Sequence, residues 1–394
     1  MLPSPIHFFA LLLTLPFAVL SSPVPWQANQ DASHYDVLIV GGGPAGLSAL
    51  SGLARVRRKA LLIDSGEYRN LLTRHAHDII GSDGVTPAYF RAKAREQISL
   101  YPTASMKNGT VTDIQQVNNS CFAITDADGN QYTSRKVVLA TGMKDVIPST
   151  PGIDENWARG IYWCPWCDGY EHRDQPLGLL GTLDKVPGLI REIETLNTDL
   201  IAFVNGTLTP ANMAALTATE PDWEKLVKAY NVQIENRTIT EIRRLQDGGI
   251  VKSAVDKAEY DKFMVYLDDG TAIERAAFFA GFESVQRSDL GRKLGVTLVN
   301  DKSLLANFTA GMVTNIAGVY AVGDANSDGS TNVPHAMWSG KRAAVQCHIT
   351  MAEEDAESAI AQAGAKAKRG AVTRRDVEES LLEFIGKDIE GLWR

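Results

Sequence analysis

Short, continuously apolar runs recur along the chain, and most of them end on glycine or an acidic residue. Runs of this kind are typical of strands that are buried on both faces of a parallel sheet. The first run, Tyr35–Val40, leads into a glycine-rich turn and then a helix from Leu47 to about Arg55. Further strands are predicted over residues 59–63, 137–142, 176–180, 200–204, 278–282 and 318–324. The pattern therefore predicts an α/β fold.

The two ends of the chain have a different character. Residues 8–20 form an apolar segment followed by Ser21 and Ser22, which predicts a cleaved signal peptide over residues 1–22. A membrane anchor is the alternative, but thirteen apolar residues interrupted by Pro16 are too few to span a bilayer. Residues 351–394 show apolar positions at helical spacing and predict a helical extension.

Glycosylation sequons agree with a secretory route, which places the protein outside the cell or in a secretory lumen. The sequons begin at Asn108, Asn118, Asn205, Asn236 and Asn307.

Composition narrows the classes of partner. The 394 residues include 39 Lys and Arg against 47 Asp and Glu, a net charge of −8. This acidic balance argues against a nucleic-acid partner. Beyond the N-terminus no apolar run is long enough to cross a membrane, so no stable membrane association is expected. Four cysteines are too few for a disulfide scaffold at this length.

The turn after the first strand matches the G-x-G-x-x-G pattern of dinucleotide-binding folds. Gly41 makes the tight turn, Gly43 lets the backbone approach a pyrophosphate, and Gly46 lets the helix pack against the strand. Pro44 and Ala45 then begin a helix whose N-terminus attracts phosphate. Asp64 ends the second strand, where a carboxylate binds the ribose hydroxyls.

Two later turns indicate which dinucleotide binds. Thr141 and Gly142 close an apolar strand in the manner of the first half of an FAD domain. Far downstream, Gly323 and Asp324 end another strand, where the acid can bind the ribityl and pyrophosphate side of a flavin. A dehydrogenase that uses NAD alone has no need of both turns, so the predicted cofactor is FAD.

A pair of cysteines carries the candidate redox chemistry. Cys164 and Cys167 are two residues apart, a spacing that closes a small, readily exchanging disulfide ring. Asp168 follows directly and can move a proton to or from a departing thiolate. A structural zinc site is an alternative, but Cys121 and Cys347 stand alone and no metal is predicted. A purely structural disulfide is the second alternative, although cross-linking so short a loop adds little to the stability of the fold.

Taken in order, these motifs resemble those of low-molecular-weight thioredoxin reductases, over about residues 33–350. The resemblance implies two Rossmann-like three-layer domains, in which the FAD domain is interrupted by a smaller NAD(P)H-domain-like insert, and a homodimer. It also implies that Cys167 faces the flavin, Cys164 exchanges with substrate, and Asp168 is the acid–base. The motifs are Gly41–Gly46, Ala140–Gly142, Cys164–Gly169 and Gly318–Asp324.

The insert lacks the second dinucleotide fingerprint that a reductase requires. After the strand at 176–180, Leu183 stands where the close-approach glycine belongs and Val186 where the third glycine belongs. A leucine side chain there would collide with a pyrophosphate. Residues 205–209 contain no basic cluster for the 2′-phosphate of NADPH. NADPH binding is therefore not expected, and O₂ is the acceptor available in a secretory compartment.

A second resemblance is to the FAD-dependent dithiol oxidases that make disulfide metabolites such as gliotoxin and holomycin. It rests on residues 64–70 with His77, Asp83–Gly84 and Pro87, and on Val333–Ala336 in place of Arg-Gln-Ala. It implies that Ser65, Asn70, His77, His335 and Ala336 lie at the flavin, with His335 also a candidate base. Structural packing is the alternative for both histidines.

Together these features predict an enzyme that oxidises a small-molecule dithiol through the cysteine pair and passes electrons to FAD and then O₂, giving H₂O₂. The alternatives are an NADPH-dependent disulfide reductase, an oxidase of protein thiols in the secretory pathway, and a flavin-binding protein without catalysis. The predicted domains are an FAD domain over 33–155 and 286–350 and the cysteine-bearing insert over 156–285.

Overall fold

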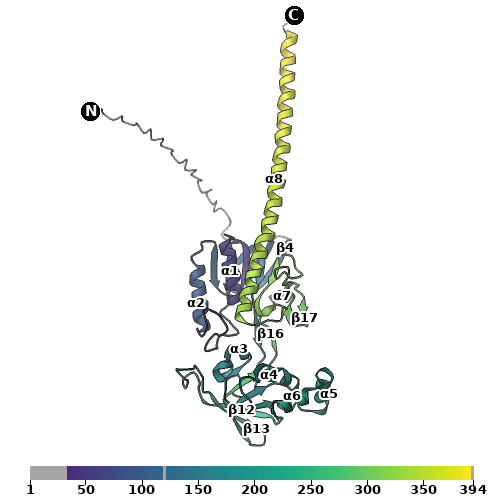
Figure 1. The fold of residues 1–394 in the computed structure, drawn as a ribbon. Coiled ribbons are helices and arrows are strands. Elements are labelled where there is room, and N and C mark those ends of the chain that lie inside the picture. The colour runs from purple at the N-terminus through teal and green to yellow at the C-terminus, as the bar shows by residue number, and fades with distance from the viewer. Residues whose placement is uncertain (1–32, 119–120, 392–394) are drawn as a thin grey trace, which may run out of the picture.

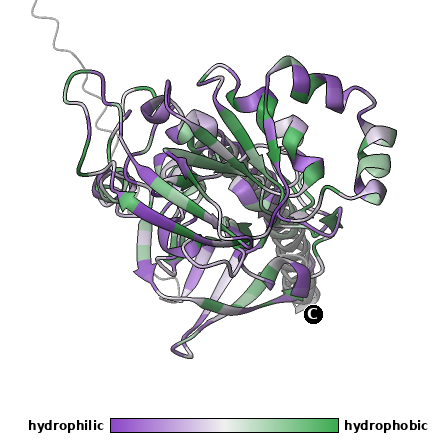
Figure 2. Ribbon diagram, turned by 90° about the horizontal axis from the view of Figure 1, so that it is seen from below, coloured by the Kyte–Doolittle hydropathy of each residue, from purple (hydrophilic) through white to green (hydrophobic). Residues whose placement is uncertain are grey.

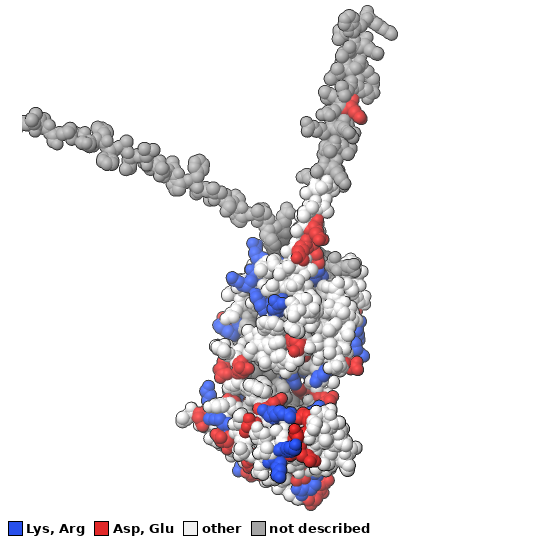
Figure 3. Space-filling model, turned by 45° about the vertical axis from the view of Figure 1, so that its right-hand side comes forward, with Lys and Arg blue, Asp and Glu red and all other residues white. Residues whose placement is uncertain are grey.

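The computed structural model describes residues 33–118 and 121–391, so the predicted signal peptide lies outside the described residues. The described chain forms two sheet-based parts that lie one above the other, with a long helix rising from the upper part (Figure 1). In Figure 2 the hydrophobic segments run through the central strands. Figure 3 shows acidic and basic side chains mixed over the face in view.

The upper part is built on a seven-stranded sheet in the order β3-β2-β1-β6-β5-β4, with β19 also paired to β6. The strands β1, β2, β3, β6 and β19 run parallel, whereas β4 and β5 are antiparallel to their neighbours. The first half of β6 pairs with β5 and its second half with β19, so the segment after residue 286 returns to the centre of this sheet. The bounds are β1 His34–Val40, β2 Ala60–Asp64, β3 Ala104–Asn108, β4 Val111–Asn118, β5 Cys121–Asp126, β6 Gln131–Leu139 and β19 Val319–Ala321.

The lower part holds a five-stranded parallel sheet in the order β11-β10-β9-β15-β8 and a three-stranded antiparallel sheet, β12-β13-β14. Its apolar cores are separate from the core of the upper part. The strands are β8 Ile161–Tyr162, β9 Leu177–Leu180, β10 Leu200–Phe203, β11 Gln233–Glu235, β12 Ile239–Gln246, β13 Lys262–Leu267, β14 Ala272–Arg275 and β15 Ala277–Ala280. The helices are α3 Pro165–Asp168, α4 Val186–Ile193, α5 Pro210–Thr219 and α6 Trp223–Ala229.

A short antiparallel ribbon joins the two parts. Strand β7 (Met143–Asp145) pairs with β16 (Ser284–Gln286), and Ser284 lies opposite Asp145. The chain leaves the upper part through β7 and returns through β16, so both crossings lie side by side. The upper part also contains α1 Pro44–Arg55, α2 Pro87–Ile98, α7 Leu290–Lys293, β17 Leu298–Val299 and β18 Ser303–Leu304.

The C-terminal segment is one continuous helix, α8 (Val333–Gly391), and not a separate helix after residue 351. Small residues let its first part pack closely on α1, because a side chain at Gly340 would run into the carbonyl oxygen of Ala45. The helix then extends well beyond the sheet (Figure 1). Lys136 and Arg135 pair with Glu354, which fixes the helix where it leaves the body. Within the described ranges, no helix has both the length and the apolar character that crossing a membrane requires.

Candidate active site

A cavity of about 650 Å³ opens where the parallel strands of the upper sheet end, and it reaches the cysteine-bearing segment of the lower part. Carboxyl ends of parallel strands are where α/β folds bind dinucleotides. Most of the predicted site residues line this cavity: Gly41, Gly43, Pro44, Ala45, Asp64, Ser65, Asn70, His77, Thr141, Gly142, Cys167, Asp168, Gly323, Asp324 and Ala336. Gly46, Cys164 and His335 lie outside its wall.

The glycine turn has the shape that a pyrophosphate needs. Gly41 has a positive φ of 106°, and a side chain there would run into the carbonyl oxygen of Ala140. Gly46 lies against the carbonyl oxygen of Gly41, which explains why it is buried behind the cavity wall. Around the Cβ position of Gly43, by contrast, the described residues place no atom within 4 Å, apart from the adjoining backbone of the turn and helix. A phosphate can therefore approach the N-terminus of α1 at Gly43.

Asp64 holds this turn in place. Its Oδ1 accepts hydrogen bonds from the backbone N–H groups of Gly42 and Gly66, each at 3.1 Å. Its Oδ2 accepts from the Tyr68 hydroxyl and the Arg95 guanidinium. The carboxylate is thus buried but fully partnered, and its predicted contact with a ribose would add to bonds that already fix the turn.

Arg69 connects the cavity to the β7–β16 ribbon between the two parts. The sequence motifs do not single out Arg69 as a site residue. Its guanidinium bonds Asp145 of β7 at 2.6 and 3.0 Å and Asp324 at 3.2 Å. It also lies 5.2 Å from the ring centre of Trp163, just before the cysteine pair. Burial raises the pKa of the Asp324 carboxyl, and Arg69 opposes this shift. The signal for Arg69 in the sequence is the run 64–70, on which the resemblance to dithiol oxidases rests.

The cysteine pair stands at the other end of the cavity. Cys164 and Cys167 form a disulfide with their Cα atoms 5.2 Å apart. Cys164 precedes α3, and Cys167 lies within this short helix and on the cavity wall. The two cysteines therefore face different surroundings, as the resemblance to thioredoxin reductases implies. Cys121 and Cys347 are free.

Asp168 follows the pair and is buried beside it. Burial raises the pKa of its carboxyl well above the usual range, and the nearby carboxylates of Glu171 and Glu259 raise it further, while Arg74 opposes them. A carboxyl in these surroundings keeps its proton at a pH where exposed aspartates are ionised. It can therefore donate this proton to a thiolate that leaves the disulfide.

We expect Asp168→Asn to stabilise the protein while it slows thiol exchange. A carboxyl whose pKa is raised by folding supports stability below its unfolded pKa, and this support is lost as the pH rises. Asparagine does not ionise, so the variant should be more stable than wild type by at least about 1 kcal/mol near pH 8 and by less near pH 5. Thermal unfolding at the two pH values measures the difference. Equal stability at both would contradict the assignment.

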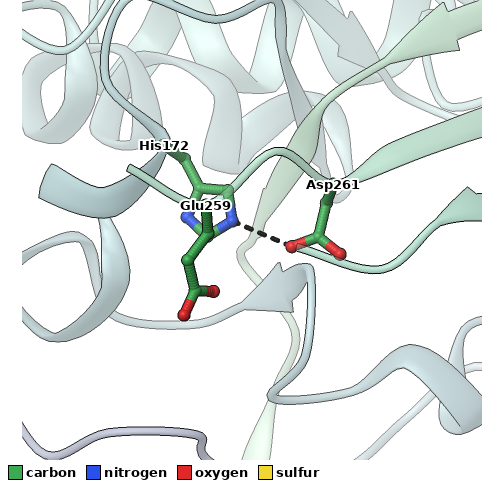
Figure 4. Close-up of side chains that lie close together, drawn as sticks. All are labelled: His172, Glu259 and Asp261. Atoms are coloured by element: carbon green, nitrogen blue, oxygen red, sulfur yellow. Dashed lines mark hydrogen bonds and ion pairs between the residues drawn. The ribbon is translucent and has the colours of Figure 1, made fainter. Parts of the chain in front are cut away.

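Behind Asp168 lies a cluster of buried charges, part of which is drawn in Figure 4. His172 Nδ1 contacts the backbone oxygen of Asp168 at 2.9 Å, and its Nε2 contacts Asp261 Oδ2 at 3.1 Å. His172, Glu259 and Asp261 are close enough together to resemble a metal site. However, Arg74 pairs with both acids, so a guanidinium already occupies the position between them. We therefore assign the cluster a structural role.

Both predicted histidines have carboxylate partners. His77 lies on the cavity wall between Asp83 and Glu171. His335, in the first turn of α8, instead contacts Asp328 Oδ2 at 2.6 Å. Asn332 and Ala336, on either side of it in the chain, line the cavity. His335 is near enough to Asp324 on the cavity wall to lower the pKa of that carboxyl, and its place at the flavin stays a prediction.

The fold and the site together define a flavin-dependent disulfide oxidoreductase, with a dinucleotide cavity that ends at a redox-active cysteine pair. The family model described as pyridine nucleotide-disulphide oxidoreductase matches residues 35–186. A probable thioredoxin reductase of Arthroderma benhamiae is 48% identical, over 91% of this chain and 89% of its own. The thioredoxin reductase aclD of Aspergillus oryzae is 30% identical, over 74% of this chain and 89% of its own. Among solved structures, HlmI is similar with a TM-score of 0.74 and 27% identity, over 86% of this chain and 99% of its own.

The chain therefore belongs to the pyridine nucleotide-disulphide oxidoreductases of the thioredoxin reductase type, and it is an FAD-dependent enzyme. The cavity fits this cofactor. The glycine turn leaves Gly43 open for the pyrophosphate, and Thr73 Oγ1 on the cavity wall is buried with no hydrogen-bond partner among the described residues. When bound, FAD would supply a group that exchanges two electrons with the cysteine pair.

Proposed function

We propose that the protein is a dithiol oxidase, which converts a small-molecule dithiol to a disulfide and passes the electrons through Cys164 and Cys167 to FAD and then to O₂. The observation that carries this proposal concerns the turn after β9 in the lower part, residues 181–186, where a second dinucleotide would bind. This second dinucleotide turn lacks the glycines that a pyrophosphate requires. A reductase must bind NADPH there, whereas an oxidase has no use for such a site.

Leu183 stands at the position of the close-approach glycine in the turn after β9. The residue is 1% exposed and packs with Leu216 of α5 and Trp223 of α6. Its backbone N–H donates to Thr207 Oγ1 at 2.9 Å, so this donor is taken as well. In dinucleotide folds this position is glycine because the backbone must approach the pyrophosphate closely. Here the same position belongs to a hydrophobic core.

The neighbouring positions support the same conclusion. The Lys185 side chain lies in the gap between Gly181 and Gly281, at the carboxyl ends of β9 and β15. Arg237, which follows β11, pairs with Glu235 and Asp269. Its guanidinium is therefore occupied by carboxylates and does not offer a free positive charge to the 2′-phosphate of NADPH. These contacts favour a domain that keeps its nucleotide-binding fold but has lost its ligand.

In the proposed reaction, a substrate thiolate attacks Cys164 Sγ, which lies off the flavin cavity, and the Cys164–Cys167 bond breaks. Cys167 leaves as a thiolate beside Asp168, whose proton stabilises it. The second substrate thiol then attacks the substrate sulfur of the mixed disulfide, so that the product disulfide forms and Cys164 is released. The cysteine pair now holds two electrons, and Cys167, which lines the cavity that would hold FAD, is the sulfur from which they would leave as the enzyme disulfide re-forms.

The experiment that tests this function follows O₂ in a solution of enzyme and dithiothreitol without NADPH. We expect one H₂O₂ to be formed for each dithiol oxidised. Reduction of a disulfide at the expense of NADPH would instead identify a reductase.

Leu183→Ala tests the structural role of the filled turn. Removal of a fully buried leucine side chain should lower the free energy of unfolding by about 2–5 kcal/mol. Turnover of dithiothreitol at a temperature where the variant is folded should stay within about twofold of wild type, because Leu183 packs in a cluster with Leu216 and Trp223 that contains neither cysteine. Urea unfolding and O₂ uptake give the two values. A stability equal to that of wild type would argue against the assigned core position.

We also propose that the enzyme enters the secretory pathway, on the basis of the predicted signal peptide and the glycosylation sequons. Asn108, Asn118, Asn205 and Asn307 are exposed, whereas Asn236 is half-buried. The four exposed asparagines are accessible to glycosylation, and we propose them as the sites that would carry glycans.

A further inference from the structure

The reaction leaves one proton to be moved between a buried site and solvent. Oxidation of a dithiol releases two electrons and two protons. When the dithiol reduces the cofactor, two electrons and one proton would pass to the cofactor, and the second proton must leave the site. When O₂ accepts the two electrons, it takes up two protons to become H₂O₂, so a proton has to return. Asp168, the acid beside the cysteine pair, is itself buried.

A line of side chains leads from Asp168 to the surface. Glu171 follows Asp168 by three residues, in the next helical turn (Tyr170–His172), and its carboxylate is near enough to raise the pKa of Asp168. His77 Nε2 lies 3.5 Å from Glu171 Oε1, and His77 Nδ1 lies 3.3 Å from Asp83 Oδ2. The exposed fraction of the side chains rises from 10% at Glu171 and 13% at His77 to 53% at Asp83.

We propose that His77 is a proton-relay residue, which connects Glu171 and Asp168 to Asp83 and the solvent. An imidazole suits this position because one ring nitrogen can accept a proton while the other releases one. The relay rests on the proposed direction of the reaction. It moves one proton outward while the cysteine pair is oxidised by the cofactor and one inward while O₂ is reduced.

The surrounding turn holds His77 between its two partners. The backbone N–H of Ala76 donates to Val85 at 2.7 Å, and that of Gly84 donates to Ala76 at 2.9 Å, which closes a tight loop. Asp83 Oδ1 accepts from the Asp78 N–H at 3.0 Å, which orients its carboxylate toward the ring.

Other charged or titratable groups also approach His77 and its partners. The His75 ring is centred 6.1 Å from that of His77, and Lys257 Nζ lies near Gly84. Glu259 and Arg74 stand beyond Glu171, on the side of Asp168. None of these groups shares the contact of His77 with both a buried and an exposed carboxylate.

The test compares wild type with His77→Gln by stopped-flow reduction of the bound flavin with dithiothreitol, without O₂. We expect the maximal rate to fall about 100-fold while the dithiol concentration for half-maximal rate is unchanged. Added imidazole should restore much of the lost rate in His77→Gln and leave wild type unaffected. The matched control is His75→Gln, which removes a neighbouring imidazole whose Nδ1 contacts the Gly84 carbonyl oxygen at 3.2 Å and whose Nε2 lies 4.0 Å from Glu259 Oε1. It should behave as wild type.

Two results would overturn the relay. His77→Gln could reduce its flavin at the wild-type rate, or it could be slow in a way that imidazole does not relieve, which would indicate a structural role. Failure of the proposed function has a different signature, because the flavin of the wild-type enzyme would then not be reduced by dithiothreitol at all.

Discussion

Cys167→Ser should retain its bound FAD but lose flavin reduction by dithiols, with a rate at least about 10³-fold below wild type. Cys167 is the sulfur of the pair that lines the flavin cavity, so its loss separates the substrate from the cofactor. Serine fills nearly the same volume but forms no disulfide with Cys164. Retention of the flavin spectrum together with the absence of bleaching by dithiothreitol would establish this role.

Cys121→Ser is the matched control. Cys121 is a free, half-buried cysteine on β5, outside the cavity, and its replacement should leave flavin reduction unchanged. Rapid bleaching of the Cys167→Ser variant by dithiothreitol would contradict the proposed path of the electrons.

Arg74→Ala should lower the free energy of unfolding by about 3–5 kcal/mol, the usual cost of leaving buried charges unpaired. Arg74 lies in the loop after β2 in the upper part, and its side chain pairs with Asp261 and Glu259 in the lower part. Its Nη1 also donates to the Tyr162 hydroxyl at 3.1 Å. Arg244 would remain as a partner of Asp261, but Glu259 would lose its guanidinium. Thermal and urea unfolding measure the loss.

Arg191→Ala provides the comparison for this variant. Arg191 pairs with Glu220 on the surface, and such exposed pairs contribute at most about 1 kcal/mol. If Arg74→Ala lost no more stability than Arg191→Ala, the buried cluster would not hold the two parts together as described.

The elements that the sequence predicts well are those whose pattern is local. Buried parallel strands are continuous apolar runs, and the glycine turn and the cysteine pair have fixed spacings, so 35–40, 59–63 and 137–142 appear as expected within or beside β1, β2 and β6. The antiparallel strands β12 and β13 alternate polar and apolar residues and border loops of mixed character, and no strand was predicted over them. Their pairing is settled by packing on the core of the lower part.

The same distinction holds within the site. Gly43, Cys167 and Asp168 could be found because their motifs are contiguous in sequence. Arg74 could not, because its partner Asp261 is 187 residues away and nothing in the spacing connects them. His335 is a further case of a contact that its motif does not show. Its position along the chain predicts a place at the flavin, and its ring contacts the carboxylate of Asp328, seven residues earlier.

The most direct test of the account mixes the purified enzyme, without O₂, with NADPH in one sample and dithiothreitol in another, and follows the visible absorbance of the flavin. We expect bleaching by dithiothreitol alone, with H₂O₂ formed once air is admitted, because Leu183 and Lys185 occupy the second dinucleotide turn. Fast bleaching by NADPH would show that this turn still binds the nucleotide and that the enzyme is a reductase.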